Sequence, residues 1–460
     1  MKQGFHALIL AAGKGTRFKS DIIKVLHPLM GRTMIDVVLD SISRLRPDRI
    51  HLVVGYQKDR VREALLSRNI DFVEQKKQLG TAHAVMAARS RLRQYPDADL
   101  LIMNGDLPLI RTKTLRPLLR QHRRQGNALT FMTSVMENPF GFGRVIDLEN
   151  GHLRIVEEKD ATPAQRKLKE ANVGIYMFKI RDLLWALPKI TNHNKKGEYY
   201  LTDTIEILSA SGRMVAPCRT ESDAEIIGVN DRSELARAVE ILRGRKVTTL
   251  AQEGVTFYDP ASTWVDFDIR IGRDTVIYPM VILEGKTRIG ERCVVYPGAH
   301  IMDARIGDSV RILTGSVLEE ATVEDGCRVG PYARLRPGTV LREGACVGNF
   351  VEMKKTDFGP GSKALHLSYV GDAEVGAKVN LGAGTITCNY DGVNKSKTRI
   401  DSGAFIGSGT QLVAPVKVGK NAYVGAGSTI TKDVSPDALA LSRVPQSEKK
   451  GWAHRKKRKQ

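Results

Sequence analysis

In the carboxyl-terminal half of the chain, one sequence pattern repeats every six residues. Ile271-Gly272-Arg273-Asp274-Thr275-Val276 sets the pattern, and Ile289-Gly290-Glu291-Arg292-Cys293-Val294 repeats it. Further copies begin at Ile306, Val329, Val347, Val375, Ile406, Val418 and Val424. An aliphatic residue followed by glycine, and then by a small or apolar residue three positions further on, is typical of a hexapeptide β-helix.

The six-residue step has a direct physical interpretation. Each hexad forms one short strand and a tight turn, its aliphatic residue points into a narrow prism, and its small residue fits the corner. Stacked coils then satisfy the backbone hydrogen bonds of their neighbours. A glycine-rich β-sandwich would not keep this phase over some 170 residues. Two segments break the phase, 352–357 and 387–399, and we expect both to be protruding loops near a binding face.

The amino-terminal half alternates between strand and helix patterns. Apolar runs predict strands at residues 7–10, 51–54 and 100–103, and apolar residues at helical spacing predict a helix over 34–45. This alternation indicates a mainly parallel sheet, and such sheets bind ligands beyond the carboxyl ends of their strands. We therefore expect an α/β domain over 1–230, a linker helix over 231–250, the β-helix over 251–448 and a basic tail over 449–460.

Charge is the outstanding feature of the composition. The 71 Lys and Arg exceed the 51 Asp and Glu by 20, which predicts anionic partners. Aromatic residues make up only 6%, which argues against a protein that stacks on nucleic-acid bases. No apolar run reaches the length of a membrane span or of a signal peptide core. The 5 cysteines include no CxxC pair, which suits free thiols in the cytoplasm.

A loop rich in small residues follows the first predicted strand. It reads Leu10-Ala11-Ala12-Gly13-Lys14-Gly15-Thr16-Arg17, and Lys24 lies seven residues further on. Such a loop lets backbone N–H groups approach a phosphate, for which the cationic side chains supply charge. It lacks the GK[ST] ending of a Walker A loop and the third glycine of a dinucleotide-binding loop. Asp106 follows another strand, and a role as a turn or helix-cap residue is as good an interpretation there as a Mg²⁺ ligand.

The loop and Lys24 resemble the LxxGxGxR…K signature of sugar-1-phosphate nucleotidylyltransferases. They are followed in order by Gln75, Gly80-Thr81-Ala82, Gly105-Asp106, Gly141-Phe142-Gly143-Arg144, Val156-Glu157, Asn172 and Gly228-Val229-Asn230, and then by the hexapeptide repeats. From about residue 5 to about 452 the chain is similar to the bacterial bifunctional N-acetylglucosamine-1-phosphate uridylyltransferases/glucosamine-1-phosphate N-acetyltransferases. This resemblance implies a Rossmann-like α/β domain and a left-handed parallel β-helix.

The resemblance also implies a uridylyl transfer site in the first domain. There N-acetylglucosamine-1-phosphate would attack the α-phosphorus of UTP, with the charge neutralised by Mg²⁺, Arg17 and Lys24. The metal ligands would be Asp106 and Asn230. The nucleotide would lie against Leu10, Ala11, Ala12 and Gly13, and its uracil would be read by Gln75, Gly80 and Thr81. The sugar would be held by Gly143, Glu157 and Asn172. Asn104 departs from the family, which often has tyrosine before the Gly-Asp pair.

A histidine lies among the hexapeptide repeats. His366 occupies the small-residue corner of its hexad, so we expect its imidazole to project outward. Near pH 7 histidine is well suited to take a proton from an amine that attacks a thioester. The resemblance makes His366 the general base, with glucosamine-1-phosphate bound by Arg336, Lys354, Tyr369, Asn380 and Lys395. It implies that acetyl-CoA contacts Ala383, Asn389, Tyr390, Ser408, Ala426 and Arg443, with Cys388 a bystander.

The leading interpretation is a two-site cytoplasmic enzyme that makes UDP-N-acetylglucosamine, with acetylation first and uridylylation second. The resemblance implies a homotrimer, because one flat prism face cannot enclose coenzyme A whereas two neighbouring prisms can. An alternative keeps only the first activity and uses the β-helix as a trimerising module. It leaves the cluster around His366 unexplained. A third interpretation, nucleic-acid binding, rests on charge alone and lacks any recognition motif.

Overall fold

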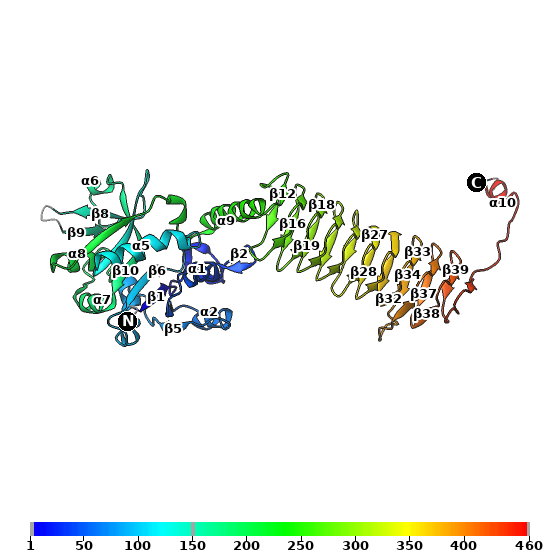
Figure 1. The fold of residues 1–460 in the computed structure, drawn as a ribbon, viewed down its shortest axis with the longest axis horizontal. Coiled ribbons are helices and arrows are strands. Elements are labelled where there is room, and N and C mark those ends of the chain that lie inside the picture. The colour runs from blue at the N-terminus through cyan, green and yellow to red at the C-terminus, as the bar shows by residue number, and fades with distance from the viewer. Residues whose placement is uncertain (1–3, 149–151, 458–460) are drawn as a thin grey trace. The chain divides into compact units, whose positions relative to one another are not determined.

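The computed structural model describes residues 4–148 and 152–457, apart from the side chain of residue 223. The chain divides at residue 242 into two compact units, which are coloured along the chain in Figure 1. Helix α9 (Arg232–Gln252) crosses this boundary. None of the helices in the described ranges combines the length and apolar character needed to span a bilayer.

The amino-terminal unit is built on a nine-stranded sheet. Its strands are β1 (Phe5–Leu10), β4 (Arg49–Val54), β5 (Asp71–Glu74), β6 (Asp99–Asn104), β7 (Leu129–Val135), β8 (Gly143–Asp147), β9 (Leu153–Val156), β10 (Glu170–Lys179) and β11 (Val215–Arg219). The order is β11-β7-β10-β6-β1-β4-β5, with β8 and β9 added beside β10. The predicted α/β fold is confirmed, and the sheet is mixed because β10 runs antiparallel to β6, β7 and β8.

Helices cover both faces of this sheet, as Figure 1 shows. They are α1 (Met34–Ser43), α2 (Lys58–Ala64), α3 (Thr81–Ala87), α4 (Arg89–Leu92), α5 (Thr112–Gln125), α6 (Pro163–Arg166), α7 (Ile180–Ala186) and α8 (Asp203–Ala210). Short 3-10 turns occur at η1 (Thr16–Phe18), η2 (Lys24–Leu26), η3 (Leu187–Lys189) and η4 (Asp223–Glu225), and β2 (Pro28–Leu29) pairs with β3 (Arg32–Thr33). Two separate apolar clusters fill the layers, one around Ile35 and Leu115 and the other around Val85 and Leu183.

The carboxyl-terminal unit is a parallel β-helix with three sheets. The first contains β12 (Thr256–Phe257), β15 (Val276–Ile277), β18 (Val294–Val295), β21 (Arg311–Ile312), β24 (Arg328–Val329), β27 (Cys346–Asn349), β30 (Lys363–His366), β33 (Asn380–Leu381), β36 (Phe405–Ile406), β39 (Tyr423–Val424) and β41 (Leu439–Ala440). The second contains β13 (Trp264–Val265), β16 (Ile282–Glu284), β19 (His300–Met302), β22 (Val317–Glu319), β25 (Arg334–Leu335), β28 (Glu352–Lys354), β31 (Tyr369–Gly371), β34 (Ile386–Cys388), β37 (Gln411–Val413) and β40 (Thr429–Ile430). The third contains β14 (Arg270–Ile271), β17 (Arg288–Ile289), β20 (Arg305–Ile306), β23 (Thr322–Val323), β26 (Val340–Leu341), β29 (Asp357–Phe358), β32 (Ala373–Val375), β35 (Thr398–Ile400) and β38 (Val416–Val418).

Stacked aliphatic residues form the interior of this prism, as the repeat predicts. Ile271 pairs with Ile289, and Ile289 with Ile306, so successive coils lie 18 and 17 residues apart. Small polar residues fill the corners and are hydrogen-bonded. Thr275, for example, is fully buried and donates to the Gly290 carbonyl at 2.8 Å. The predicted left-handed β-helix fold of hexapeptide repeats is therefore confirmed.

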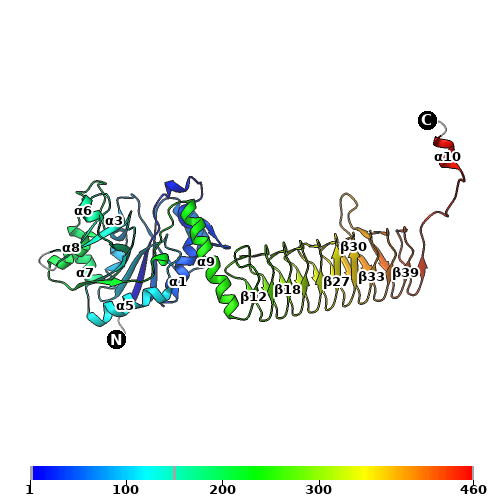
Figure 2. The ribbon, with the colours of Figure 1, turned by 90° about the horizontal axis from the view of Figure 1, so that it is seen from above.

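One of the two predicted loops is a loop, and the other is not. Residues 352–357 continue the stacking as β28 and the first residue of β29. The phase is hidden there because Met353 replaces the usual aliphatic residue in the interior, where it is fully buried. The second break does leave the prism between β34 and β35, and Figure 2 shows it as a long excursion beside β30.

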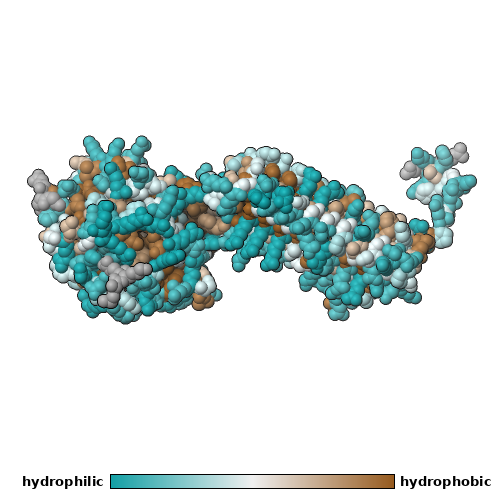
Figure 3. Space-filling model, viewed as in Figure 1, coloured by the Kyte–Doolittle hydropathy of each residue, from teal (hydrophilic) through white to brown (hydrophobic). Residues whose placement is uncertain are grey.

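Charged and polar residues cover most of the surface on the face drawn in Figure 3. The basic tail contains α10 (Trp452–Lys457), whose side chains are exposed. Its last three residues lie outside the described ranges.

Candidate active sites

The carboxyl end of β1 opens into the loop of small residues. Gly15 has a left-handed φ of 63°, and a side chain there would come within 2.6 Å of Lys24 Cβ. Only glycine therefore lets Lys24 pack over the loop. A Cβ added to Gly13 would meet nothing within 4 Å, so the loop is open at that point. Ala11 and Ala12 are buried, and the Ala11 N–H donates to the Val53 carbonyl at 2.9 Å, which ties the start of the loop to β4.

Lys24, Asp106 and Asn230 meet at one point. The Lys24 ammonium lies 2.5 Å from Asp106 Oδ2 and donates to Asn230 Oδ1 at 3.2 Å. The Val229 N–H donates to the Asp106 carbonyl at 2.9 Å, which ties residues 228–230 to the end of β6. Within the described residues no three His, Cys, Asp or Glu side chains gather as a metal site. One carboxylate and one amide oxygen are nonetheless the kind of donor set that Mg²⁺ takes when substrate phosphates complete its shell.

The three predicted sugar-binding residues also lie together. Gly143 pairs with Asn172 across β8 and β10, and a Cβ added to Gly143 would lie 3.6 Å from Glu157 Oε2. Thr202 donates to Glu157 Oε1 at 3.1 Å, while burial raises the pKa of the Glu157 carboxyl. Asn172 donates to the hydroxyl of Tyr176 at 2.8 Å. Polar donors and one carboxylate therefore converge on this part of the cavity.

A bulge in β10 shapes the same wall. The pairing of β10 with β7 shifts between Asn172 and Tyr176, and Gly174 within the shift has a φ of 79°. A Cβ on Gly174 would lie 3.6 Å from Asn104 Nδ2. Burial raises the pKa of the Tyr176 phenol, so it stays protonated and neutral. Asn104, the residue that departs from the family, thus faces the bulge.

The predicted uracil readers form a second group. Gln75 is buried, and its Nε2 donates to the Gly80 carbonyl at 3.3 Å and lies 3.0 Å from His83 Nδ1. Thr81 begins α3, and its hydroxyl accepts the Leu201 N–H at 3.0 Å. These contacts fix the turn that precedes α3.

A cavity of about 500 Å³ joins most of these groups. Eight of the predicted residues line it: Leu10, Arg17, Thr81, Asp106, Gly143, Glu157, Asn172 and Asn230. Gln75 donates to the carbonyl of Gly80, the residue before Thr81, and Lys24 contacts the site by its ion pair with Asp106. The wall residues that the sequence analysis did not assign include Phe140, Phe142, Tyr176 and Thr202. Phe142 lies within the Gly141-Phe142-Gly143-Arg144 stretch and Phe140 precedes it, but no local pattern marks Tyr176 or Thr202.

In the β-helix, three cations gather on the second sheet. Arg336 follows β25 and Lys354 ends β28, the next strand of that sheet. The Lys395 ammonium is the main cause of a lowered pKa at Lys354, and Arg336 adds to it. Arg336 is partly neutralised by Glu352, to which it donates at 2.8 Å. Cations that disfavour one another's charge are relieved by a phosphate, which is the group predicted to bind here.

Tyr369 and Asn389 fill the space beside this cluster. Gly371 pairs with Lys354 across β28 and β31. A Cβ on Gly371 would collide with the Tyr369 hydroxyl and lie 3.0 Å from Asn389 Nδ2. Asn389 in turn donates to the Asp372 carboxylate. The absence of a side chain at position 371 leaves room for these two polar groups next to the partner of Lys354 in the sheet.

His366 ends β30 and is exposed, as its hexad position predicts. It pairs with Asn349 of the preceding coil, and its Nδ1 lies 3.0 Å from Asn349 Oδ1. Because an amide oxygen only accepts, this contact requires the proton on Nδ1. Nε2 is then left with a free lone pair, which is what a general base needs.

A track of small side chains leads away from His366. The same turn position in the next three coils is occupied by Ala383, Ser408 and Ala426. Backbone hydrogen bonds of 2.7 and 2.8 Å join these turns, and Arg443 Nη1 donates to the Ala426 carbonyl at 2.9 Å. Four residues predicted to contact acetyl-CoA therefore follow one line along the prism.

The remaining predicted residues lie in β33 and in the excursion after β34. Asn380 begins β33, in register with Lys363 of β30. Tyr390 forms an antiparallel bridge with Lys395, which closes the base of the excursion and holds Lys395 near Lys354. Cys388 is a half-buried free thiol next to Asn389.

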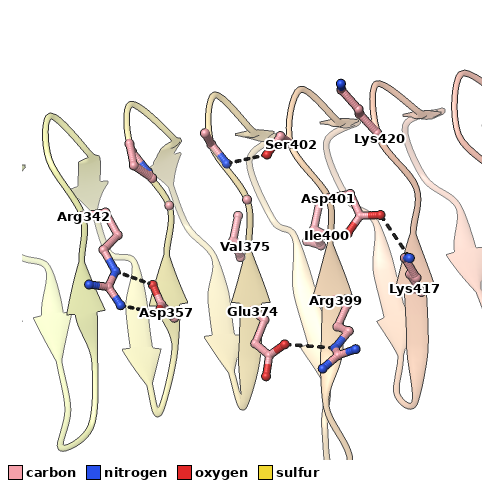
Figure 4. A pocket seen from close by; sticks show the side chains of 14 residues that line it. Arg342, Asp357, Glu374, Val375, Arg399, Ile400, Asp401, Ser402, Lys417 and Lys420 are labelled. Carbon is pink, nitrogen blue, oxygen red and sulfur yellow. Dashed lines mark hydrogen bonds and ion pairs between the residues drawn. The ribbon is translucent and has the colours of Figure 1, made fainter.

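A hollow of about 980 Å³ contains none of the predicted residues. It lies on the third sheet of the β-helix, and Figure 4 shows Arg342, Arg399 and Lys417 each paired with a carboxylate, with Lys420 outside these pairs. Arg342 binds Asp357 at 2.6 Å, Arg399 binds Glu374 at 2.9 Å, and Lys417 lies 3.3 Å from Asp401. Since these charges neutralise one another on an open surface, the hollow offers a ligand little binding energy.

Comparison with known proteins gives one family match in each of the two units. Residues 7–160 match the MobA-like NTP transferase domain, and residues 397–432 match the bacterial transferase hexapeptide of six repeats. A protein of Thermotoga maritima named "Bifunctional protein GlmU" is 47% identical over 99% of this chain and 100% of its own length. Proteins with the same name from Geotalea uraniireducens and Geobacillus thermodenitrificans are 45% and 46% identical, each over 98% of this chain and 99% and 98% of their own lengths.

Proposed function

The chain belongs to the family of bifunctional GlmU proteins, and from this premise we propose which residues carry its two reactions. The protein is a transferase with a uridylyltransferase and an acetyltransferase activity, and it makes UDP-N-acetylglucosamine. Glucosamine-1-phosphate is first acetylated from acetyl-CoA, and the product then receives the uridylyl group of UTP. The observation that carries the assignment is the presence of both predicted clusters, one in each unit.

We assign uridylyl transfer to the cavity of the first unit. Asp106 and Asn230 would hold Mg²⁺, which when bound neutralises phosphate charge. Arg17 and Lys24 add fixed positive charge, and Glu157 and Asn172 orient the N-acetylated sugar. The sugar-phosphate oxygen forms a bond to the α-phosphorus of UTP while the bond to pyrophosphate breaks. Alignment and charge neutralisation supply most of the rate, because the protein performs no covalent step.

We assign acetyl transfer to the surface around His366. Arg336, Lys354 and Lys395 bind the phosphate, so that the sugar amine points toward the histidine. Nε2 accepts the amine proton as the nitrogen attacks the thioester carbonyl, and coenzyme A leaves as the thiolate. The track of small side chains beyond His366 supports a role in receiving acetyl-CoA.

We propose a homotrimer in which neighbouring prisms complete the acetyl transfer site. The turn position after His366 has a left-handed φ in every coil from 280 to 427, and glycine occupies it at 298, 315, 384, 409 and 427. Tyr332, Phe350 and Leu367 occupy it in three successive coils, with 53%, 59% and 62% of each residue exposed. Bulky apolar residues at strained and exposed positions support burial against a second copy.

We also place the protein in the cytoplasm, where acetyl-CoA and UTP are available. All 5 cysteines are free thiols, in keeping with a reducing compartment. The excess of positive charge is assigned to phosphorylated metabolites rather than to nucleic acid, since both proposed sites bind polyanions. Seven of the basic residues lie in the last twelve positions, and we treat that tail as a solvated terminus.

One incubation tests both assignments together. The protein is supplied with glucosamine-1-phosphate, acetyl-CoA, UTP and Mg²⁺, and free thiol and pyrophosphate are followed in the same sample. We expect thiol release to precede pyrophosphate release, because the acetylated sugar is the substrate of the second reaction. If N-acetylglucosamine-1-phosphate is added to this same mixture and pyrophosphate is released with no thiol, the result would instead support the alternative in which the β-helix is only a scaffold.

A further inference from the structure

Residues 199–202, which we call the strap, lie against the turn that contains the proposed uracil readers. The Tyr199 N–H donates to the Leu79 carbonyl, and the Ala82 N–H donates to the Tyr199 carbonyl, both at 2.9 Å. Between these bonds Gly80 has a φ of 110°, and a Cβ there would lie 2.5 Å from the Tyr199 oxygen. The strap and the turn therefore touch backbone to backbone, with no room for a side chain.

A side chain adds a third link on the nucleotide side. The hydroxyl of Thr81 accepts the Leu201 N–H at 3.0 Å. Leu201 and Thr202 are both buried, so the strap can shift only together with the turn to which it is bonded. Any ligand that fixes Gly80 and Thr81 must therefore also fix the strap.

The other end of the strap reaches the sugar side of the cavity. Thr202 Oγ1 donates to Glu157 Oε1 at 3.1 Å. Glu157 is only half-buried and is the first residue after β9, so its carboxylate needs such a donor to hold one orientation. A hydrogen bond to a charged group is among the stronger ones in proteins.

We propose that the strap couples the uracil and sugar subsites, with Thr202 as the positioning residue that holds Glu157 toward the sugar. This inference rests on the proposed uridylyl transfer function. UTP seated on Gly80 and Thr81 fixes the strap, and the fixed strap presents Glu157 in its binding orientation. Linkage makes the effect reciprocal, so N-acetylglucosamine-1-phosphate must raise the affinity for UTP by the same factor.

The test is Thr202→Val, which keeps the shape of the side chain and removes the donor. We expect the KM for N-acetylglucosamine-1-phosphate at saturating UTP to rise about tenfold or more, while the dissociation constant of UTP without the sugar changes less than about threefold. An initial-rate matrix over both substrates gives each dissociation constant with and without the other. In the wild type, the ratio of the dissociation constant without the other substrate to the constant with it should exceed one. In Thr202→Val this ratio should fall to one. Thr202→Ser, which restores the hydroxyl, should recover both values.

Thr204→Val is the matched control. Thr204 is equally buried, but its hydroxyl donates to the Leu201 carbonyl at 2.6 Å. If both KM values rise in Thr202→Val and rise equally in Thr204→Val, the role of Thr202 is merely structural and the inference is overturned. Wild-type KM values in Thr202→Val would also overturn it. If the wild type forms no UDP-sugar at all, the proposed function itself fails, which is a separate outcome.

Discussion

The two proposed sites of this chain are built in opposite ways. Residues between 10 and 230 converge on the uridylyl transfer cavity, which encloses about 500 Å³ and draws each side chain from a different strand end or loop. The acetyl transfer site is an open surface on which Arg336, Lys354 and His366 are placed by stacking of similar coils. The cavity therefore depends on long-range contacts, whereas the surface depends on regular repetition.

Each site is therefore vulnerable to mutation in a different way. In the cavity, functional side chains contact one another directly, as in the ion pair of Lys24 with Asp106 and the hydrogen bond of Thr202 to Glu157. A single change there disturbs neighbours. On the β-helix each functional residue stands on a backbone that is hydrogen-bonded to the neighbouring coils, independently of its side chain, so a change of side chain should remain local.

His366→Ala should have the largest effect. Loss of a general base lowers a rate by about 10²–10⁴-fold, and we expect acetyl transfer to fall within this range. Uridylyl transfer to N-acetylglucosamine-1-phosphate should stay unchanged, because the variant lies in the other unit. Thiol release and pyrophosphate release, assayed separately on one preparation, measure both. Equal damage to both reactions in a folded protein would refute two independent sites.

Asp106→Ala should produce the reverse pattern. The variant removes the carboxylate that faces Lys24 and is proposed to hold Mg²⁺, so uridylyl transfer should fall about 10²–10³-fold. Acetyl transfer should continue at the wild-type rate. Chelation of divalent cations should give the same split without any mutation. Uridylyl transfer that survives chelation would contradict the magnesium assignment.

Phe350→Gly should affect the stability of the trimer and that of the isolated prism in different ways. Phe350 has a φ of 55°, which glycine adopts without strain, so an isolated prism should be as stable or more stable after the change. A trimer that buries Phe350 should instead dissociate at about tenfold higher protein concentration, and acetyl transfer should be lost on dilution. Sedimentation and activity across a dilution series measure both. Unchanged assembly would show that this edge of the prism is not the contact.

Asp203→Asn should have the smallest effect, and only in the first unit. Burial, with the charges of Glu157 and Glu206, raises the pKa of Asp203 to about 6. The folded state therefore binds this proton more tightly than the unfolded chain, so wild-type stability declines as the pH rises from about 4 to 6 and is level above. The neutral amide should add about 1–2 kcal/mol at pH 7 and nothing near pH 3.

Trp185 provides the readout for this last effect, because the other two tryptophans, Trp264 and Trp452, lie in the second unit. With both of those replaced by phenylalanine, fluorescence follows unfolding of the first unit alone. A pH-independent difference between the wild type and Asp203→Asn would contradict the raised pKa.

The β-helix could be predicted from sequence because every coil places its residues in the same environment. The aliphatic column and the outward imidazole of His366 follow from the phase alone. The phase misled only at 352–357, where Met353 fills the interior without the usual glycine beside it. Stacking tolerates that exchange because side-chain volume, rather than residue type, is what the interior requires.

The cavity could be predicted only in part. Strand ends and glycines mark the loop after β1 and Asp106, and the family resemblance supplies most of the other residues. Thr202 escaped because its partner, Glu157, lies 45 residues away. No local periodicity encodes a hydrogen bond between two segments that meet only after the sheet has formed. Asp203 shows the same limit, since its raised pKa depends on burial and on Glu157.

The stacking of coils in a shared register also determines how this chain tolerates insertions and deletions. Removing residues 272–289 would take out one whole layer, because Ile271 and Ile289 are stacked partners. Every later residue would keep its face, and the prism would only become shorter. Removing nine residues between Lys354 and His366 would instead turn His366 onto another face than its phosphate-binding neighbours. Length in this unit is therefore an evolvable property, adjustable in whole layers without altering the chemistry downstream.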